Sequence, residues 1–152
     1  MKRTLIHNAT IVNEGQPTQG SVVIENGRIA EVLTNWKPLS APCEEVIDAT
    51  GCYLLPGIID DHVHFRDPGL THKADILTES SAAAAGGVTS IMDMPNTNPL
   101  TVTLDALNSK FDLLNEKCIV NHSCYFGATN DNYTEFDLSL IHISEPTRLL
   151  SI

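Results

Sequence analysis

Two histidines two positions apart, His62 and His64, open the densest group of polar side chains in the sequence. They follow an apolar run typical of a β-strand, where side chains at i and i+2 point to the same face. Imidazole nitrogen is a common ligand for zinc and similar metals, so the pair could hold one ion. A His-x-His pair alone is more often two exposed or hydrogen-bonded side chains near a turn. The neighbouring Asp60, Arg66 and Asp67 favour the metal site.

Alternating strand and helix patterns surround this cluster. Residues 58–60, two isoleucines and an aspartate, complete an apolar run that predicts a strand leading into the histidines. A helix is expected from about Asp75 to Ala85, with Gly86-Gly87 supplying a left-handed C-terminal cap. Residues 88–94 predict the next strand. Strands separated by single helices indicate parallel pairing through right-handed crossovers.

A second helix and a third strand continue the pattern over residues 104–117 and 119–126. One face of this helix carries apolar side chains at helical spacing, namely Leu104, Leu107, Phe111 and Leu114. Barrel enzymes place their sites at the carboxyl ends of such strands, where the histidines lie. Periodicity alone leaves a closed barrel and an open doubly wound sheet as alternatives.

The first fifty residues predict a small β unit. Short strands are expected over residues 4–6 and 10–12, followed by a polar turn over residues 13–20. Asn26-Gly27 between two apolar runs predicts a hairpin, because both residues tolerate positive φ in a type I′ turn. A further strand is expected over residues 45–48.

Two motifs carry a resemblance to a known family. Residues 56–60 (PGIID) running into His62-Val63-His64 resemble the first-strand signature of the amidohydrolase superfamily, barrel hydrolases with one or two metal ions. The continuation over residues 65–69 (FRDPG) looks like the dihydroorotases, and residues 94–99 (MPNTNP) look like their second motif. The resemblance extends from near the first residue to about Asn130.

The resemblance implies an α/β fold, a (β/α)8 TIM barrel preceded by a small N-terminal β domain. We expect the β domain over residues 1–53 and the first part of the barrel over residues 54–138. About three strands fit in that length, whereas a complete barrel takes ~250 residues. Residues 139–152 resemble translated sequencing-adapter read-through. They are therefore expected to be a non-native tail, and His142 is not counted as a ligand.

Residue roles follow from the same resemblance. His62 and His64 match the first pair of metal ligands. Arg66 matches the residue that binds the substrate carboxylate, and its planar guanidinium suits a carboxylate because it donates two parallel hydrogen bonds. Asn96 matches a second substrate contact, and Asp60 is expected to orient a ligand by hydrogen bonding.

Simpler alternatives exist for single side chains. Arg66 could form a surface salt bridge with Asp61 or Asp67, and Asn96 could be a turn residue beside Pro95. The remaining histidines have structural interpretations: His7 and His122 as hydrogen-bonded strand residues, and His72 as a solvated one. Asp93, near a strand end, is assigned no role.

The resemblance implies a zinc-dependent dihydroorotase, with one or two ions per full-length subunit. Such an enzyme reversibly hydrolyses the cyclic amide of dihydroorotate to N-carbamoyl-L-aspartate in pyrimidine (UMP) biosynthesis. Its other ligands and its catalytic aspartate lie on later strands, so no catalytic residue is assigned and the chain alone is expected to be inactive. Alternatives are a hydantoinase- or allantoinase-type amidohydrolase and a non-catalytic dihydroorotase-like subunit.

Composition limits the partners. With 9 basic and 19 acidic residues the formal net charge is −10, which argues against binding nucleic acid through phosphates. No apolar run approaches the ~20 residues of a membrane span. The four cysteines form no C-x-x-C pair and are expected to be reduced and mostly buried in a cytoplasmic protein. The expected partner is a small-molecule substrate, and a homo-oligomer is left open.

Overall fold

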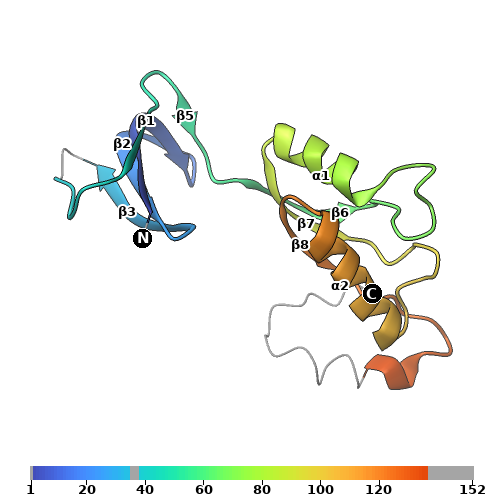
Figure 1. Ribbon diagram of the computed structural model, residues 1–152. Helices are drawn as coiled ribbons and strands as arrows, with labels where there is room; N and C mark the ends of the chain where they lie inside the picture. The colour runs from blue at the N-terminus through green and yellow to red at the C-terminus, as the bar shows by residue number, and fades with distance from the viewer. Residues whose placement is uncertain (1, 35–37, 137–152) are drawn as a thin grey trace. The chain divides into compact units, whose positions relative to one another are not determined.

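The chain forms two compact units, Met1–Pro56 and Gly57–Ile152, in a computed structural model that describes residues 2–34 and 38–136 (Figure 1). The predicted non-native tail over residues 139–152 lies outside the described residues. No helix in the described part of the chain has both the length and the apolar character that a membrane crossing needs.

The first unit is a five-stranded sheet. Its strands are β1 Arg3–Asn13, β2 Gln16–Glu25, β3 Arg28–Thr34, β4 Glu45–Asp48 and β5 Tyr53–Leu54. They run in the order β3-β2-β1-β4, and β5 also pairs with β1. β1 is antiparallel to β2 and parallel to β4 and β5. The small N-terminal β unit is therefore present, and the predicted domain boundary between Tyr53 and Leu54 lies within β5.

Two tight turns connect the antiparallel strands. The predicted hairpin is confirmed, because Asn26 (φ 53°) and Gly27 (φ 74°) both have the positive φ of a type I′ turn. Glu14 (φ 50°) and Gly15 (φ 74°) form a second such turn. The predicted polar turn over residues 13–20 is therefore wrong, since residues 16–20 belong to β2. Their polar side chains stay exposed or half-buried while the backbone pairs with β1, so polarity there did not indicate a loop.

Asn8, in a left-handed conformation (φ 58°), lies at an irregularity in β1. The irregularity separates residues 4–6 from residues 10–12, the two short apolar stretches of the predicted β unit. They belong to one strand, because pairing with β2 resumes at Ala9.

The second unit holds the three predicted strands and the two helices between them. Its elements are β6 Ile58–Val63, α1 Ile76–Ala85, β7 Val88–Asp93, α2 Leu104–Lys117 and β8 Asn121–Cys124. The strands are parallel in the order β6-β7-β8, as predicted. The third strand is shorter than the predicted 119–126.

Both helices of this unit pack on the same face of the sheet. One apolar core joins Ile76 of α1 and Leu107 and Leu114 of α2 to the sheet residues Ile91 and Cys124. Right-handed crossovers produce this arrangement, because each places its helix on the same side of a parallel sheet. The carboxyl ends of β6, β7 and β8 therefore share one edge.

Side-chain caps start both helices. Asp75 accepts a hydrogen bond from the Thr78 amide (3.0 Å), and this bond holds the pKa of Asp75 below its ordinary value. Thr103 caps α2 by accepting from the Ala106 amide (3.2 Å). After α1, Gly87 takes the left-handed conformation (φ 87°), as predicted for this pair of glycines.

All four cysteines are free. Cys124 is buried, Cys43 and Cys118 are half-buried, and Cys52 is exposed. The expectation that most of them are buried was wrong, because Cys43 and Cys52 lie in and beside short, exposed segments of the first unit.

Candidate functional site

The rings of His62 and His64 lie side by side at the carboxyl end of β6. Their centroids are 5.2 Å apart, with planes inclined by 60°. His62 is the fifth residue of β6, and His64 directly follows the strand's last residue, Val63. The alternation of side chains along a strand accounts for this, since residues i and i+2 share a face.

His64 is also joined to the loop that follows β7. Its Nδ1 lies 2.8 Å from Oδ1 of Asn96. When Nδ1–H donates to this oxygen, the lone pair on Nε2 is left for a metal ion. A backbone hydrogen bond from Met94 to the Val63 carbonyl (2.9 Å) holds the two strand ends together beneath this contact. His64, a candidate metal ligand, and Asn96, a candidate substrate contact, therefore meet at one edge of the sheet.

Asp60 supports the backbone of His62. Its Oδ1 accepts a hydrogen bond from the His62 amide at 3.2 Å. The expected role was to orient a metal ligand, and the contact in the structure reaches the ligand's main chain and not its ring.

Arg66 has a guanidinium that is available for an anion. The residue is half-buried and left-handed (φ 67°), and within the described residues its side chain forms no hydrogen bond or ion pair. The alternative of a salt bridge with Asp67 is not seen, because that carboxylate pairs with Lys117 (2.7 Å). The hydrogen bond to Asp67 raises the pKa of Lys117. Asp61 is not a partner of Arg66 either.

A buried ion pair contacts the backbone of residues 65–67. Lys110 of α2 and Asp93, the last residue of β7, pair through Nζ and Oδ2, and each side chain is 1% exposed. Oδ1 of Asp93 accepts from the Phe65 amide (2.9 Å), and the Lys110 ammonium donates to the Asp67 carbonyl.

Sequence reasoning missed this pair. Asp93 was assigned no role, and Lys110 was not considered. A signal was present, because Lys110 lies three residues after Leu107 and four before Leu114, on the buried face of α2. A lysine in the middle of an apolar stripe needs a buried partner.

Tyr125 follows β8 at the same edge of the sheet. Its side chain is buried, and its amide donates to the Asp93 carbonyl (2.9 Å). Burial, with a smaller contribution from the negative charge of Asp61, raises the pKa of Tyr125. The phenol is therefore neutral at physiological pH.

The two imidazoles fit part of a metal site. Zinc in proteins takes four ligands, or three with an open position for water. Within residues 2–34 and 38–136, no group of three or more His, Cys, Asp or Glu side chains is arranged to hold an ion. The described residues thus offer two nitrogen donors on one strand end, and further ligands would have to come from elsewhere.

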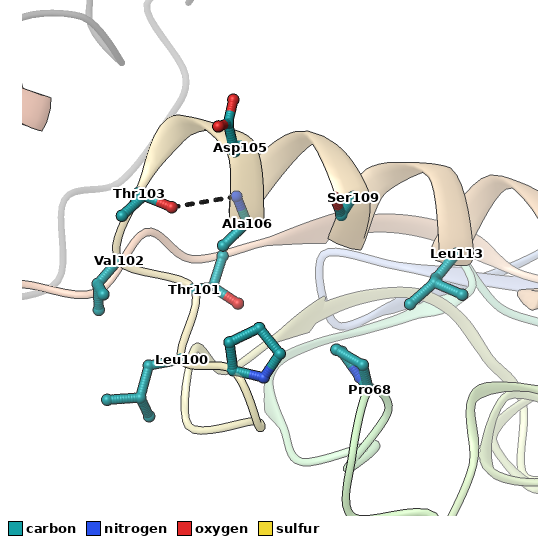
Figure 2. Close-up of a pocket in the computed structure, with 10 residues that line it drawn as sticks. Pro68, Leu100, Thr101, Val102, Thr103, Asp105, Ala106, Ser109 and Leu113 are labelled. Carbon is teal, nitrogen blue, oxygen red and sulfur yellow. Dashed lines mark hydrogen bonds between the residues drawn. The ribbon is translucent and has the colours of Figure 1, made fainter.

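A separate pocket lies beside α2 (Figure 2). Its volume is about 650 Å³, and its wall includes Pro68, Leu100 and Leu113. The capping hydrogen bond, which the Ala106 amide donates to Thr103 Oγ1, lies among the lining residues in the close-up. No candidate site residue lines it, so this pocket is distinct from the edge that carries His62.

Comparison with known proteins gives one family. The family described as dihydro-orotase-like matches residues 51–146. The match continues past residue 138, where the predicted non-native tail begins, and so lends no support to an end of native sequence there.

Curated relatives carry the same name. A dihydroorotase of Enterococcus faecalis is 38% identical over 134 residues, covering 88% of this chain and 31% of the relative. A dihydroorotase of Streptococcus thermophilus is 45% identical over 97 residues, covering 62% of this chain and 22% of the relative. The chain thus spans about a third of the length of such relatives, or less.

Solved structures with the same fold are hydantoinases. An L-hydantoinase (dihydropyrimidinase) from Arthrobacter aurescens superposes with a TM-score of 0.85 at 28% identity, covering 93% of this chain and 31% of that one. A dihydropyrimidinase from Brevibacillus agri gives a TM-score of 0.74 at 30% identity, covering 93% of this chain and 31% of that one. These likenesses confirm the predicted fold class, the first part of an amidohydrolase barrel behind a β unit.

Proposed function

The chain belongs to the dihydroorotase-like family, and on that premise we propose that it is the N-terminal part of a zinc-dependent dihydroorotase. The observation that carries the proposal is the pair of adjacent rings, His62 and His64, followed two residues later by Arg66, whose side chain has no partner within residues 2–34 and 38–136. Metal ligands beside a free guanidinium suit a substrate that carries both a cyclic amide and a carboxylate. Dihydroorotate has both groups.

His62 and His64 are the proposed metal ligands in this chain. When bound, zinc supplies a Lewis acid and lowers the pKa of water from ~16 to around 7, which gives a nucleophile at neutral pH. The number of ions, one or two per subunit, and the other ligands belong to the complete protein. The complete protein is the full-length polypeptide encoded in the reading frame that contains this chain.

Arg66 is the proposed receptor for the substrate carboxylate. A guanidinium donates two parallel hydrogen bonds to a carboxylate, which fixes the orientation of the bound molecule as well as its position. Asn96 is the proposed second contact, and its amide can both donate and accept. Together the two side chains would hold the ring so that its amide faces the metal ligands, and correct placement alone lowers a barrier substantially.

The proposed setting is the cytoplasm, in the step of pyrimidine biosynthesis that interconverts dihydroorotate and N-carbamoyl-L-aspartate. Free cysteines and the acidic charge balance support a reducing compartment and a small-molecule substrate. Because the described residues offer two metal ligands, we expect the 152-residue chain alone to have no turnover.

A hydantoinase is the second candidate, favoured by the names of the solved structures with this fold. Hydantoin and dihydrouracil share the cyclic amide of dihydroorotate and lack its carboxylate. Arg66, two residues after His64 and without a side-chain partner among the described residues, therefore favours dihydroorotate.

The test is substrate profiling of the complete protein together with metal analysis. We expect turnover of dihydroorotate far above that of hydantoin and dihydrouracil, with bound zinc. The opposite order of substrates would replace the proposal by the hydantoinase. Zinc-free protein without turnover of any cyclic amide would point to a non-catalytic subunit.

A further inference from the structure

Residues 65–67, with Arg66 in the middle, are held at both ends by the buried ion pair of Asp93 and Lys110. Phe65 donates its amide hydrogen to Oδ1 of Asp93 (2.9 Å), and the Asp67 carbonyl accepts from the Lys110 ammonium. Asp93 and Lys110 are ion-paired through Oδ2 and Nζ. A closed ring of contacts therefore runs from the residue before Arg66 to the residue after it.

This ring encloses a backbone conformation that the residue type does not favour. Arg66 has φ 67°, in the left-handed region that costs a non-glycine residue free energy. Such a conformation persists when its surroundings determine it. Here the Phe65 amide and the Asp67 carbonyl are fixed from β7 and α2, and Leu70 also donates its amide hydrogen to the Arg66 carbonyl (3.0 Å).

The charges of the pair are expensive to bury. Lys110 and Asp93 each retain 1% exposure. Removing two ions from water costs about as much as their attraction returns, so a buried pair of this kind is often no more stabilising than apolar side chains of the same size. Overall stability is thus a weak reason for a lysine and a carboxylate at these two positions.

We propose that the Asp93–Lys110 pair is a positioning device for Arg66, which fixes the left-handed turn and so sets the affinity of the site for a carboxylate. The aspartate is suited to this because its two oxygens serve two partners. The lysine is suited because its ammonium forms an ion pair with the carboxylate while it donates a hydrogen bond to the Asp67 carbonyl. The link from Arg66 to carboxylate affinity rests on the proposed function; the link from the pair to Arg66 does not.

The decisive variants alter the pair without stranding a charge. Lys110→Met removes the ammonium and leaves the buried Asp93 carboxyl without a cation, so it could fail to fold. The double variant Asp93→Asn with Lys110→Met has no buried charge and keeps an oxygen for the Phe65 amide, while the contact to Asp67 is lost. Lys117→Arg is the control on α2, since it changes the other lysine that contacts this loop and keeps a cation for the Asp67 side chain; KM should stay at the wild-type value.

Steady-state kinetics of the complete protein separate positioning from stability. For the double variant we expect KM for dihydroorotate to rise about 10- to 100-fold, the size of effect that misplaced binding groups produce, with bound zinc unchanged. In an Arg66→Ala background the same double variant should change KM by less than about 2-fold, because residues that act through one another are non-additive. Equal effects in both backgrounds would overturn the proposal.

A second measurement does not depend on activity. In the double variant, the NMR coupling between the Arg66 amide proton and Hα should change as φ leaves the left-handed region. The Phe65 amide hydrogen should exchange faster with solvent, while the amide hydrogen of Ile91 in the core stays protected. An unchanged Arg66 coupling would overturn the proposal even if kinetics changed. If the wild-type protein failed to turn over dihydroorotate, the proposed function would fail, and this measurement would still decide the role of the pair.

Discussion

The imidazole of His64 and the side-chain amide of Asn96 are hydrogen-bonded, with 2.8 Å between Nδ1 and Oδ1, across 32 positions of sequence. The contact joins the carboxyl end of β6 to the loop after β7. It gives Asn96 a second effect besides its proposed contact with substrate, because the bond selects which ring nitrogen of His64 carries the proton. On the proposed roles of His64 and Asn96, metal binding and substrate binding would be coupled through this one amide.

Asn96→Ala should weaken metal binding as well as substrate binding. Without the acceptor, Nδ1–H of His64 loses its partner and the ring can rotate or change tautomer. Loss of such a supporting group typically lowers metal affinity about 10- to 100-fold. Competition with a chelator, measured on the complete protein, gives the affinity directly.

Asn98→Ala is the matched control for this variant, because Asn98 lies in the same loop and its side chain has no hydrogen-bond partner among the described residues. It should leave zinc affinity unchanged. If Asn96→Ala raised KM and left zinc affinity at the wild-type value, the bond to His64 would be irrelevant to the metal.

Replacing either candidate ligand should have a larger effect. His62→Asn or His64→Asn removes one of the two nitrogen donors, so we expect zinc affinity to fall by more than about 100-fold, the upper end of the effect of a supporting group. Elemental analysis after dialysis reports the loss. His72→Asn is the control, as this exposed histidine lies in the following loop. A zinc-replete His64→Asn protein would remove His64 from the proposed site.

Much of this edge was predictable because its signals are local. The strand period places His62 and His64 on one face without any tertiary information, and Asn26-Gly27 specifies its own turn. The helix bounds followed from apolar spacing together with the glycines that end α1. These features depend on residues only a few positions apart.

The misses depend on partners far along the chain. Residues 16–20 look like a turn by composition, and only pairing with β1 shows them to be strand. The Asp93–Lys110 pair joins residues from different elements, so the apolar stripe of α2 signals a buried lysine but does not identify its partner. The same holds for Lys117, whose charge removes Asp67 as a partner for Arg66.

The capping aspartate of α1 should make stability depend on pH in the acid range. The folded-state pKa of Asp75 is lowered, mainly by the hydrogen bond from the Thr78 amide. A lowered pKa means that the contribution is complete above the unfolded-state value, near 3.8, and is lost as pH falls through the folded-state value. Asp75→Asn keeps a capping oxygen without the titration, so its urea midpoint should fall less than the wild-type midpoint on acidification.

Comparison of Asp75→Ala with Asp75→Asn separates the effect of the capping hydrogen bond from the effect of the charge. The alanine variant is the more severe of the two. It removes both, so the urea midpoint should already be lower at neutral pH, where the Asn variant stays closer to wild type. Identical acid dependence in wild type and Asp75→Asn would show that the carboxylate does not titrate through this contact.

Gly69 is the glycine at which a side chain should be least tolerated, because two obstacles coincide there. Its φ is 82°, and an added Cβ would lie 2.0 Å from the backbone oxygen of Asn98, an atom that cannot rotate away. Gly87 has a similar φ of 87° with nothing within 4 Å, so Gly87→Ala measures the conformational cost alone, about 1–2 kcal/mol. Gly69→Ala should cost clearly more. Hydrogen exchange of the β7 amides reports the stability of this unit, and equal losses for the two variants would mean that the loop after β7 moves freely away from Gly69.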